Sequence, residues 1–354
     1  AVVRPSSLHF ADLPMERPAL LDRVSPLSAA LILIAPFFLW GTAMVAMKGV
    51  IDTTAPLFLA GVRLLPAGGL VLLTGLYFQR PQPSTWQAWG WIVLFGLVDG
   101  TLFQGFLAEG LTRTGAGLGS VMIDSQPLAV AVMARFLFQE QVGPIGWLGL
   151  GIGVLGISLI GLPDNWIVSL FSGHWPLAAD QITDNLLARG EWLMLLAALS
   201  MAVGTVMIRF VSRHADPVMA TGWHMVLGGV PLFLASALNE TAPWQGVSAG
   251  GWAAIAYATL FGSALAYGIF FYLAAQGNLT SLSALTFLTP VFALLFGMLL
   301  LSESLTSPQW IGVGLTLISI YCINQRAQLL DRYQQLSERL GMTIPPQETE
   351  SESL

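Results

Sequence analysis

The stretch that decides the fold occurs twice in this sequence. Residues 127–147 read PLAVAVMARFLFQEQVGPIGW, and residues 290–310 read PVFALLFGMLLLSESLTSPQW. In both copies a glutamate follows the proline after 13 residues, and a tryptophan follows the glutamate after seven more. Two equal spacings in matched apolar segments indicate an internal duplication.

Apolar runs of this kind fill most of the chain. A helix that crosses a hydrocarbon core of ~30 Å needs about 20 mostly apolar residues. Ten runs qualify: 28–51, 55–78, 86–108, 114–138, 144–162, 192–211, 217–238, 249–275, 280–301 and 308–324. The chain has 14 Lys and Arg and 20 Asp and Glu residues, and only six of these fall inside the runs. Because a charge at mid-bilayer is costly, this partition predicts an all-α polytopic membrane protein with ten transmembrane helices.

The bulk composition excludes most other classes of protein. Only 10% of the 354 residues are charged and mean hydropathy is +0.71, whereas soluble domains carry about 25% charge. The net charge of −6 leaves no basic face for a nucleic acid,. Cys322 is the only cysteine, and the His, Cys and acidic residues show no metal-ligand spacing,. We therefore expect no nucleic-acid partner, metal, cofactor or catalytic residue.

The duplication extends beyond the quoted stretch. Leu94-Phe95-Gly96 recurs as Leu260-Phe261-Gly262, Gly41-Thr42 recurs as Gly204-Thr205, and Pro56 and Arg63 match Pro217 and His224. Each copy holds five runs, and five is odd, so the second copy enters the membrane inverted. Inverted repeats are typical of secondary transporters. The predicted domains are residues 28–162 and 192–324, joined by an external loop at 163–191.

The basic residues predict the orientation. Ten Arg residues fall on the side of the N-terminus and three Lys or Arg on the opposite side. Because cytoplasmic loops carry the excess of Lys and Arg, we expect a cytoplasmic N-terminal segment (1–27) and a cytoplasmic, disordered tail (325–354). The first 27 residues lack the apolar core of a signal peptide,.

These motifs resemble a known family. Trp40-Gly41-Thr42, Pro56 and Arg63 are similar to the opening of an EamA domain, and the segment from Pro127 to Trp147 is similar to its close. The whole of 28–324 resembles the two EamA domains of an exporter of the drug/metabolite transporter superfamily. This resemblance implies a multi-pass carrier of the inner (plasma) membrane that exports amino acids or other small metabolites.

Two carboxylates lie deepest in the predicted spans, Asp99 and Asp124. Gln126 and Pro127 follow Asp124, and Pro127 breaks the helix, as Pro290 does in the second copy. Broken helices near the midplane are where carriers build sites. One hypothesis is that Asp124 and Asp99 bind a substrate ammonium group or a proton. The alternative is that each only holds helices together through a hydrogen bond.

Four further residues are candidates for the substrate or proton pathway. Arg63 lies nine residues into its run, about 13 Å from the outer end; it either clamps a substrate carboxylate or pairs with a backbone carbonyl or with Asp99 or Asp124. His224 either shuttles protons or is a core histidine. Trp40 and Tyr267 are the aromatic candidates for stacking on a solute. Glu140 and Glu303 are expected to cap helices or close a gate.

The leading hypothesis is a secondary transporter that exports small polar metabolites, amino acids among them, by alternating access with proton coupling. Its partners would be the substrate, protons and the lipid bilayer, and the chain would act as a monomer or homodimer. A sugar-phosphate or nucleotide-sugar antiporter is the alternative, although only Arg63 would meet the phosphate. A membrane assembly subunit is a second alternative. An enzyme would need a nucleophile–base pair or metal triad within the spans, and the sequence contains none.

Overall fold

The computed structural model describes residues 24–51, 53–113, 122–162, 190–301, 304–326 and 329, and within these ranges all regular structure is helical. Eight of the described helices are long and apolar enough to cross a membrane. Two more described helices correspond to the runs at 114–138 and 308–324. The prediction of an all-α membrane protein is confirmed. The terminal segments, the loop at 163–189 and Glu303 lie outside the described residues.

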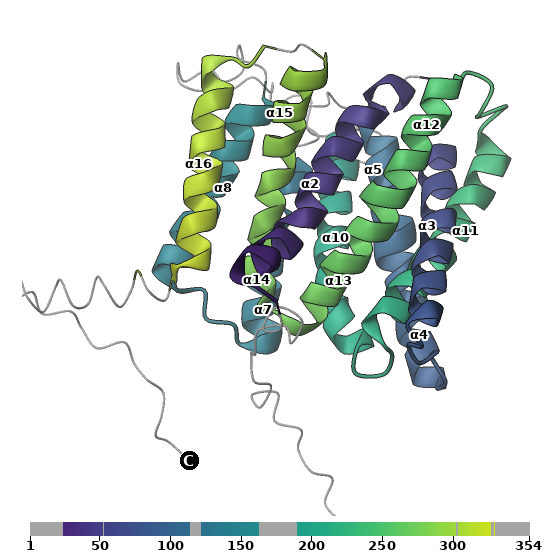
Figure 1. The fold of residues 1–354 in the computed structure, drawn as a ribbon, viewed down its shortest axis with the longest axis horizontal. Helices are drawn as coiled ribbons and strands as arrows, with labels where there is room; N and C mark the ends of the chain where they lie inside the picture. Colours follow the sequence, from purple (N-terminus) through teal and green to yellow (C-terminus); the bar gives the residue numbers. More distant parts are fainter. Residues whose placement is uncertain are drawn as a thin grey trace, which may run out of the picture.

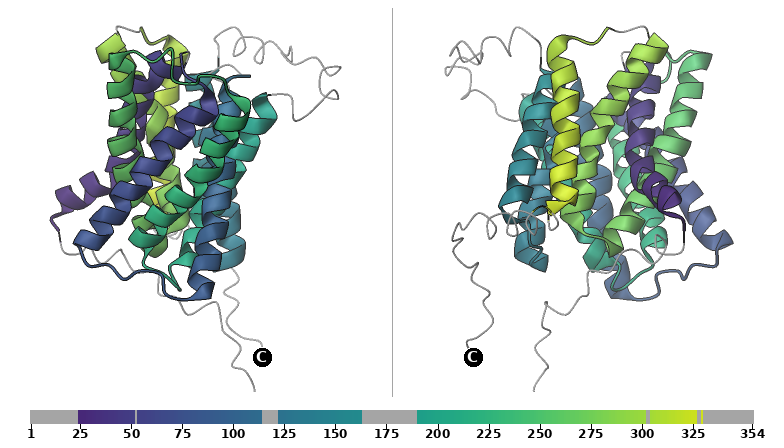
Figure 2. Two further views of the ribbon diagram at one scale, coloured as in Figure 1. Left: turned by 90° about the vertical axis from the view of Figure 1, so that its right-hand side faces the viewer. Right: turned by 60° about the vertical axis from the view of Figure 1, so that its left-hand side comes forward.

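The helices run between the same two faces in all views (Figures 1 and 2). We call the face where the first helix begins and the last ends the lower face, and the other the upper face. The first half contains α2 (Pro26–Ile51), α3 (Pro56–Tyr77), α4 (Trp86–Phe95), η1 (Gly96–Phe103), α5 (Gln104–Leu111), α7 (Gln126–Phe138) and α8 (Gly143–Gly161). The second half contains α10 (Gly190–Val211), α11 (Pro217–Asn239), α12 (Ala249–Tyr257), η4 (Ala258–Leu265), α13 (Ala266–Gln276), α14 (Leu279–Ala284), η5 (Leu285–Phe287), α15 (Leu288–Leu301) and α16 (Ser307–Asn324).

The third span of each half changes helix type at its centre. The elements η1 and η4 are π-helices, and each lies between two α-helical segments of one continuous span. Such π-helical turns are rare and occur frequently at functional sites. Their presence at the same place in both halves agrees with the duplication and marks the third spans as the elements to inspect for a site.

The two predicted helix breaks coincide with changes in the helices. Ser125 forms a turn and α7 begins at Gln126, so Pro127 occupies the first turn, where its missing N–H costs nothing,. In the second half the ninth span runs through α14, a 3₁₀ turn (η5) and α15, and Pro290 is the third residue of α15.

The two halves interleave rather than forming separate bodies. The helices α3 and α11 lie against each other at one end of the bundle, α8 and α16 at the other end, and α2 against α15 between them (Figure 1). Glycines allow the close approach: a Cβ on Gly156 would lie 2.9 Å from the carbonyl oxygen of Gly312. Gly153 and Gly156 are thus part of a face on which α8 packs closely against α16,.

Hydrogen bonds and an ion pair connect the ends of α3 and α11. The carboxylate of Glu240, which follows α11, accepts hydrogen bonds from the backbone N–H groups of Leu57 and Phe58 at 2.8 and 2.9 Å. Asp216 caps the start of α11 and lies 3.2 Å from Arg80, which follows α3. A carboxylate therefore lies at the first turn of each helix, where the helix dipole is positive. For α3 the carboxylate is Glu240, which follows α11; for α11 it is Asp216, which pairs with Arg80 beyond the end of α3.

Candidate functional site

Polar side chains from seven spans meet in the middle of the bundle. We call this set the central polar layer, and it contains Trp40 (α2), Arg63 (α3), Asp99 (η1), Gln104 (α5), Gln126 (α7), Thr205 (α10), His224 (α11), Ser263 (η4) and Tyr267 (α13). Polar groups in a membrane-spanning core are costly and are a functional-site hypothesis by default. The layer contains every sequence-predicted site residue except Asp124 and the two prolines.

Asp99 and His224 form a pair that is closed off from solvent. The Oδ2 atom of Asp99 lies 3.2 Å from Nε2 of His224, and both side chains are 1% exposed. Phe95 stacks on the imidazole at 4.1 Å between ring centroids, and Phe271 meets it edge-on. The other polar atom of each group, Oδ1 of Asp99 and Nδ1 of His224, is buried without a hydrogen-bond partner.

Close backbone packing holds this pair in place. A Cβ on Gly204 would lie 2.6 Å from the Cβ of Asp99, and a Cβ on Gly100 would lie 2.7 Å from the Cα of Gly228. The hydroxyl of Thr101 donates to the carbonyl oxygen of Gly228 at 2.9 Å. The π-helical turn η1 therefore lies directly on α11, which explains how a carboxylate reaches a histidine 125 residues away in the sequence.

Arg63 makes a different set of contacts. Its Nη2 atom donates to Oγ of Ser263 at 3.4 Å, a long hydrogen bond, and its Nε is buried without a partner. Within the part of the chain that the structure describes, no carboxylate forms an ion pair with Arg63. The pairing with Asp99 that the sequence left open is therefore not formed, because Asp99 bonds to His224 instead.

The aromatic residues Tyr267 and Trp40 also belong to the central polar layer. Tyr267 accepts a hydrogen bond from Nε2 of Gln104 at 2.9 Å through its hydroxyl oxygen, and its ring lies 5.3 Å from that of Trp40. The indole Nε1 of Trp40 is buried without a partner. The two aromatic residues chosen from the sequence thus lie in contact, whereas Gln104 was missed, although a lone amide inside an apolar run is a signal that could have found it.

The break before α7 contributes a second amide. Nε2 of Gln126 donates to Oγ1 of Thr205 at 3.2 Å, while Oε1 of Gln126 has no partner. Asp124 is buried at the turn two residues earlier, with 8% of its surface exposed. Asp124 is thus a buried acid two positions before Gln126, a member of the central polar layer.

A pocket leads from the upper face to this layer. It has a volume of about 80 Å³ and is lined by the upper ends of α2, α3 and α5, with Thr54, Pro56 and Thr112 at the outer end and Arg63 and Gln104 at the inner end. Its remaining walls are apolar. The pocket therefore presents one cation and one amide to anything that enters from above.

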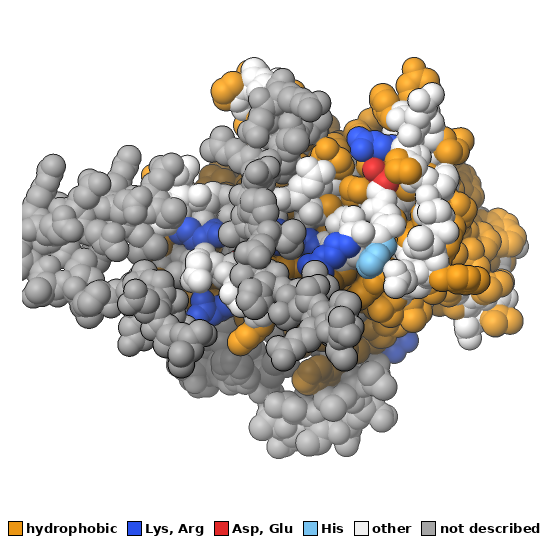
Figure 3. Space-filling model, turned by 90° about the horizontal axis from the view of Figure 1, so that it is seen from below, with side chains coloured by type: hydrophobic (Ala, Val, Ile, Leu, Met, Phe, Trp, Pro, Cys, Tyr) orange, Lys and Arg blue, Asp and Glu red, His pale blue; other side chains and the backbone are white. Residues whose placement is uncertain are grey.

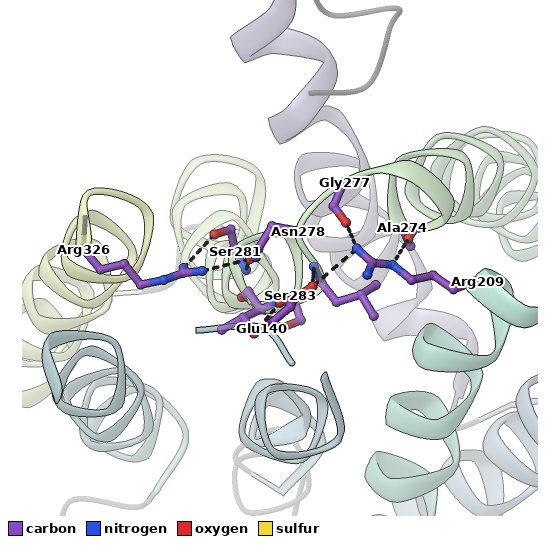
Figure 4. Close-up of polar contacts among 10 residues, drawn as sticks. Glu140, Arg209, Ala274, Gly277, Asn278, Ser281, Ser283 and Arg326 are labelled. Carbon is purple, nitrogen blue, oxygen red and sulfur yellow. Dashed lines mark hydrogen bonds and ion pairs between the residues drawn. The ribbon is translucent and has the colours of Figure 1, made fainter. Parts of the chain in front are cut away.

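At the lower face the bundle is tied together by Glu140 (Figure 4). This carboxylate is fully buried and accepts hydrogen bonds from the backbone N–H groups of Leu279 and Thr280 and from the hydroxyl of Thr280. It also lies 3.3 Å from Nη2 of Arg209. Glu140 thus caps the first turn of α14, as the sequence led us to expect of it.

Two arginines approach the turn between α13 and α14 from opposite sides (Figure 4). Arg209 donates to the backbone carbonyl oxygens of Ala274 and Gly277. Arg326, which lies beyond the end of α16, donates to the side chains of Ser281 and Asn278 at 2.9 and 3.3 Å. Burial lowers the pKa of Arg326, and the negative charge of Glu140 offsets part of this shift,. We call Glu140, Arg209 and Arg326 the lower latch, since they join α7, α10, α14 and α16.

The described residues offer no site for a metal ion, because no group of three His, Cys, Asp or Glu side chains lies close enough together among them. The groups that the central polar layer presents are ionisable, hydrogen-bonding and aromatic side chains.

Comparison with known proteins agrees with this architecture. The model of the EamA-like transporter family matches residues 27–162 and 188–325. An uncharacterized transporter of Synechocystis, sll0355, is 64% identical over 85% of this chain and 91% of its own length. The WAT1-related chloroplastic protein At3g02690 of Arabidopsis thaliana is 51% identical over 83% of this chain and 68% of its own length.

More distant proteins extend the same pattern. The uncharacterized inner membrane transporter YedA of Escherichia coli is 27% identical over 82% of this chain and 89% of its own length. A crystal structure superposes with a TM-score of 0.70 at 17% identity over 88% of this chain and all of that chain, which shows the fold alone. Because the family model matches both halves and eight of the described helices are long and apolar enough to cross a membrane, this chain belongs to the EamA-like transporter family and is a multi-pass membrane transporter.

Proposed function

We propose that this transporter exports small polar metabolites, amino acids among them, by alternating access and with proton coupling. In this proposal the lower face and both termini are cytoplasmic, and the membrane is the plasma (inner) membrane. The substrate occupies the central polar layer, and the two halves of the inverted repeat open it to one face at a time. The protein acts as a monomer or homodimer without a cofactor.

The observation that carries the proposal is the unequal access to the central polar layer. The pocket reaches Arg63 and Gln104 from the upper face. At the lower face the fully buried Glu140 and its arginines bind the α13–α14 turn. One state of an alternating-access carrier requires a central site that a pocket connects to one face and that side-chain contacts close at the other face.

The charge on the two faces supports the orientation. Arg80, Arg135, Arg209, Arg213 and Arg326 belong to the lower ends of described helices or the turns beyond them, whereas Lys48 and Arg113 belong to upper ends. Figure 3, which views the molecule from below, shows several basic side chains and little acidic surface among the described residues. This is the bias expected of a cytoplasmic face.

Proton coupling is supported by the buried Asp99–His224 pair. One carboxylate and one imidazole share a hydrogen bond, and each keeps a second polar atom without a partner. Adding or removing a proton changes the net charge of this pair in a setting with little water, so the two protonation states favour different packing of η1 against α11. Asp124 is a second buried acid, and in this proposal it is the other candidate to bind the proton.

The alternative substrates are less well supported. A sugar phosphate carries two negative charges and needs paired cations, but Arg63 is the one cation among the residues that line the described pocket. An assembly subunit would have no use for a pocket that ends at a cation in the bundle interior.

The test is counterflow in proteoliposomes. Proteoliposomes that contain the purified protein and are preloaded with unlabelled amino acids are expected to accumulate radiolabelled amino acids from outside. An imposed pH gradient is expected to drive net flux. The Asp99→Asn variant should keep exchange and lose the response to the pH gradient, and Asp124→Asn tests the second acid in the same assay. No substrate-dependent flux across a wide panel of amino acids would contradict the proposal, and an unchanged gradient response in both variants would reject proton coupling.

A further inference from the structure

The two halves make the same kind of contact at the centre but with different chemistry. The second span of each half packs on the π-helical turn of the other half, α11 on η1 and α3 on η4. In the first of these contacts His224 meets Asp99 at 3.2 Å. In the second, Arg63, the repeat counterpart of His224, meets Ser263 at 3.4 Å. The stronger cation therefore faces the neutral hydroxyl, and the weaker one faces the acid.

This arrangement leaves Arg63 without a counter-charge. Arg63 is the eighth residue of α3, its Nε is buried with no hydrogen-bond partner, and no described carboxylate pairs with it. A charge within a bilayer core is expensive unless it is paired. Arg63 also lines the inner end of the pocket, so an anion that enters from the upper face reaches it directly.

The pocket indicates which anion fits. Gln104 lies beside Arg63 at the inner end, and the walls above are apolar, with Met47, Leu59 and Leu107 among them. An arginine binds a carboxylate through a two-pronged pair of hydrogen bonds. One cation balances one negative charge, which suits a carboxylate and leaves half of a phosphate dianion unpaired. The apolar walls suit the hydrocarbon part of a small organic acid.

We propose that Arg63 and Ser263 form a subsite for the carboxylate group of the transported solute, which lies next to Arg63 as the carboxyl group of Asp99 lies next to His224 in the equivalent contact between η1 and α11. This proposal rests on the proposed transport function and specifies its substrate class as solutes with one carboxylate, of which amino acids are the test case. Arg63 is then a specificity-determining residue, and the buried hydroxyl of Ser263 positions its guanidinium group.

The sharpest test installs the missing acid. In Ser263→Asp the new carboxylate lies beside Arg63 and occupies the subsite from within, whereas Ser263→Asn has the same size without the charge. Binding is measured as the rise in melting temperature of the purified protein in nanodiscs, since a ligand that binds only the folded state raises it. The probes are a mixture of neutral L-amino acids, the same mixture as carboxamides, and glucose 6-phosphate.

For the wild type and Ser263→Asn we expect the amino acids to bind about 10- to 100-fold more tightly than their carboxamides, the range expected for a hydrogen-bonded charge pair. Ser263→Asp should lose this preference. Equal binding of the carboxamides, no stabilisation of the wild type by amino acids, or stabilisation by glucose 6-phosphate that depends on Arg63 would each overturn the assignment.

Two controls keep the result interpretable. If Ser263→Asp does not elute as a single species, Arg63→Lys and Arg63→Gln replace it, and only the lysine variant should retain part of the preference. Transport is measured in parallel by counterflow. Failure of all flux would reject the proposed function, whereas flux that is unaffected by Ser263→Asp and equal for carboxamides would reject the carboxylate subsite alone.

Discussion

The contact between α11 and η1 and the contact between α3 and η4 come from the same five-helix unit, yet only one of them is complete. Asp99 and His224 satisfy each other inside a closed aromatic surround, whereas Arg63 faces a hydroxyl at the end of a pocket. The duplication thus has two equivalent positions, of which one is closed off from solvent and the other borders a pocket. Inverted symmetry alone would not have revealed this division.

The largest effect is expected from Glu140→Ala, which removes the lower latch. The substitution removes the counter-charge of Arg209 and the acceptor of two backbone N–H groups of α14, at a cost of about 4 kcal/mol. In a Cys322→Ala background, a cysteine at Ser283 should become reactive to an impermeant maleimide added from the lower side. The same cysteine with Glu140 intact is the control, and equal labelling in both would show that Glu140 does not close the lower face.

The Asp99→Ala variant tests the complete contact. It leaves Nε2 of His224 unpaired in a dry environment and opens space next to Gly204, so we expect a loss of about 3 kcal/mol of stability. The measurement is reversible unfolding in mixed micelles. If Asp99→Ala lowers the free energy of unfolding by less than a typical surface substitution does, then the Asp99–His224 pair does not stabilise the contact between η1 and α11.

Phe95→Leu weakens the same contact without touching its hydrogen bond. The stacking of Phe95 on His224 is expected to contribute about 1 kcal/mol beyond the apolar area that both side chains bury. The double variant Phe95→Leu/His224→Leu completes a thermodynamic cycle. A coupling energy near zero in that cycle would show that Phe95 only fills space.

Ser263→Ala should have the smallest effect. The hydrogen bond that it removes is long at 3.4 Å, so the loss in stability is expected to be less than about 1 kcal/mol. Amino acid binding should persist, since the guanidinium of Arg63 stays in place. A destabilisation as large as that of Asp99→Ala would make the two contacts energetically equal and remove the contrast between them.

Much of the fold could be predicted from the sequence because its signals are local and repeated. The 13- and 7-residue spacings, the apolar runs and the odd number of runs per copy suffice for ten helices in two inverted units. The π-helical form of η1 and η4 could not be predicted, since nothing in the composition of these segments separates them from an α-helix.

The candidate site was predicted only as a set of residues. Asp99, Arg63 and His224 stand out as ionisable groups within apolar runs, but which of them pair depends on how η1 and η4 approach the helices of the opposite half. For η1 that approach is set by Gly100 against Gly228, a contact between residues 128 positions apart in the chain. Ser263 gave no signal, because an uncharged hydroxyl within a span is common.

The interleaving of the halves has a consequence for how the molecule is made. Every extensive helix pair named above, α3 with α11, α8 with α16 and α2 with α15, joins one copy to the other, so neither copy buries its own apolar faces alone. The chain is in effect an antiparallel dimer made covalent by fusion. Two separately synthesised halves, divided between 162 and 190, would carry all of these interfaces. The covalent link mainly ensures that the two copies are made in equal numbers and enter the membrane in opposite orientations.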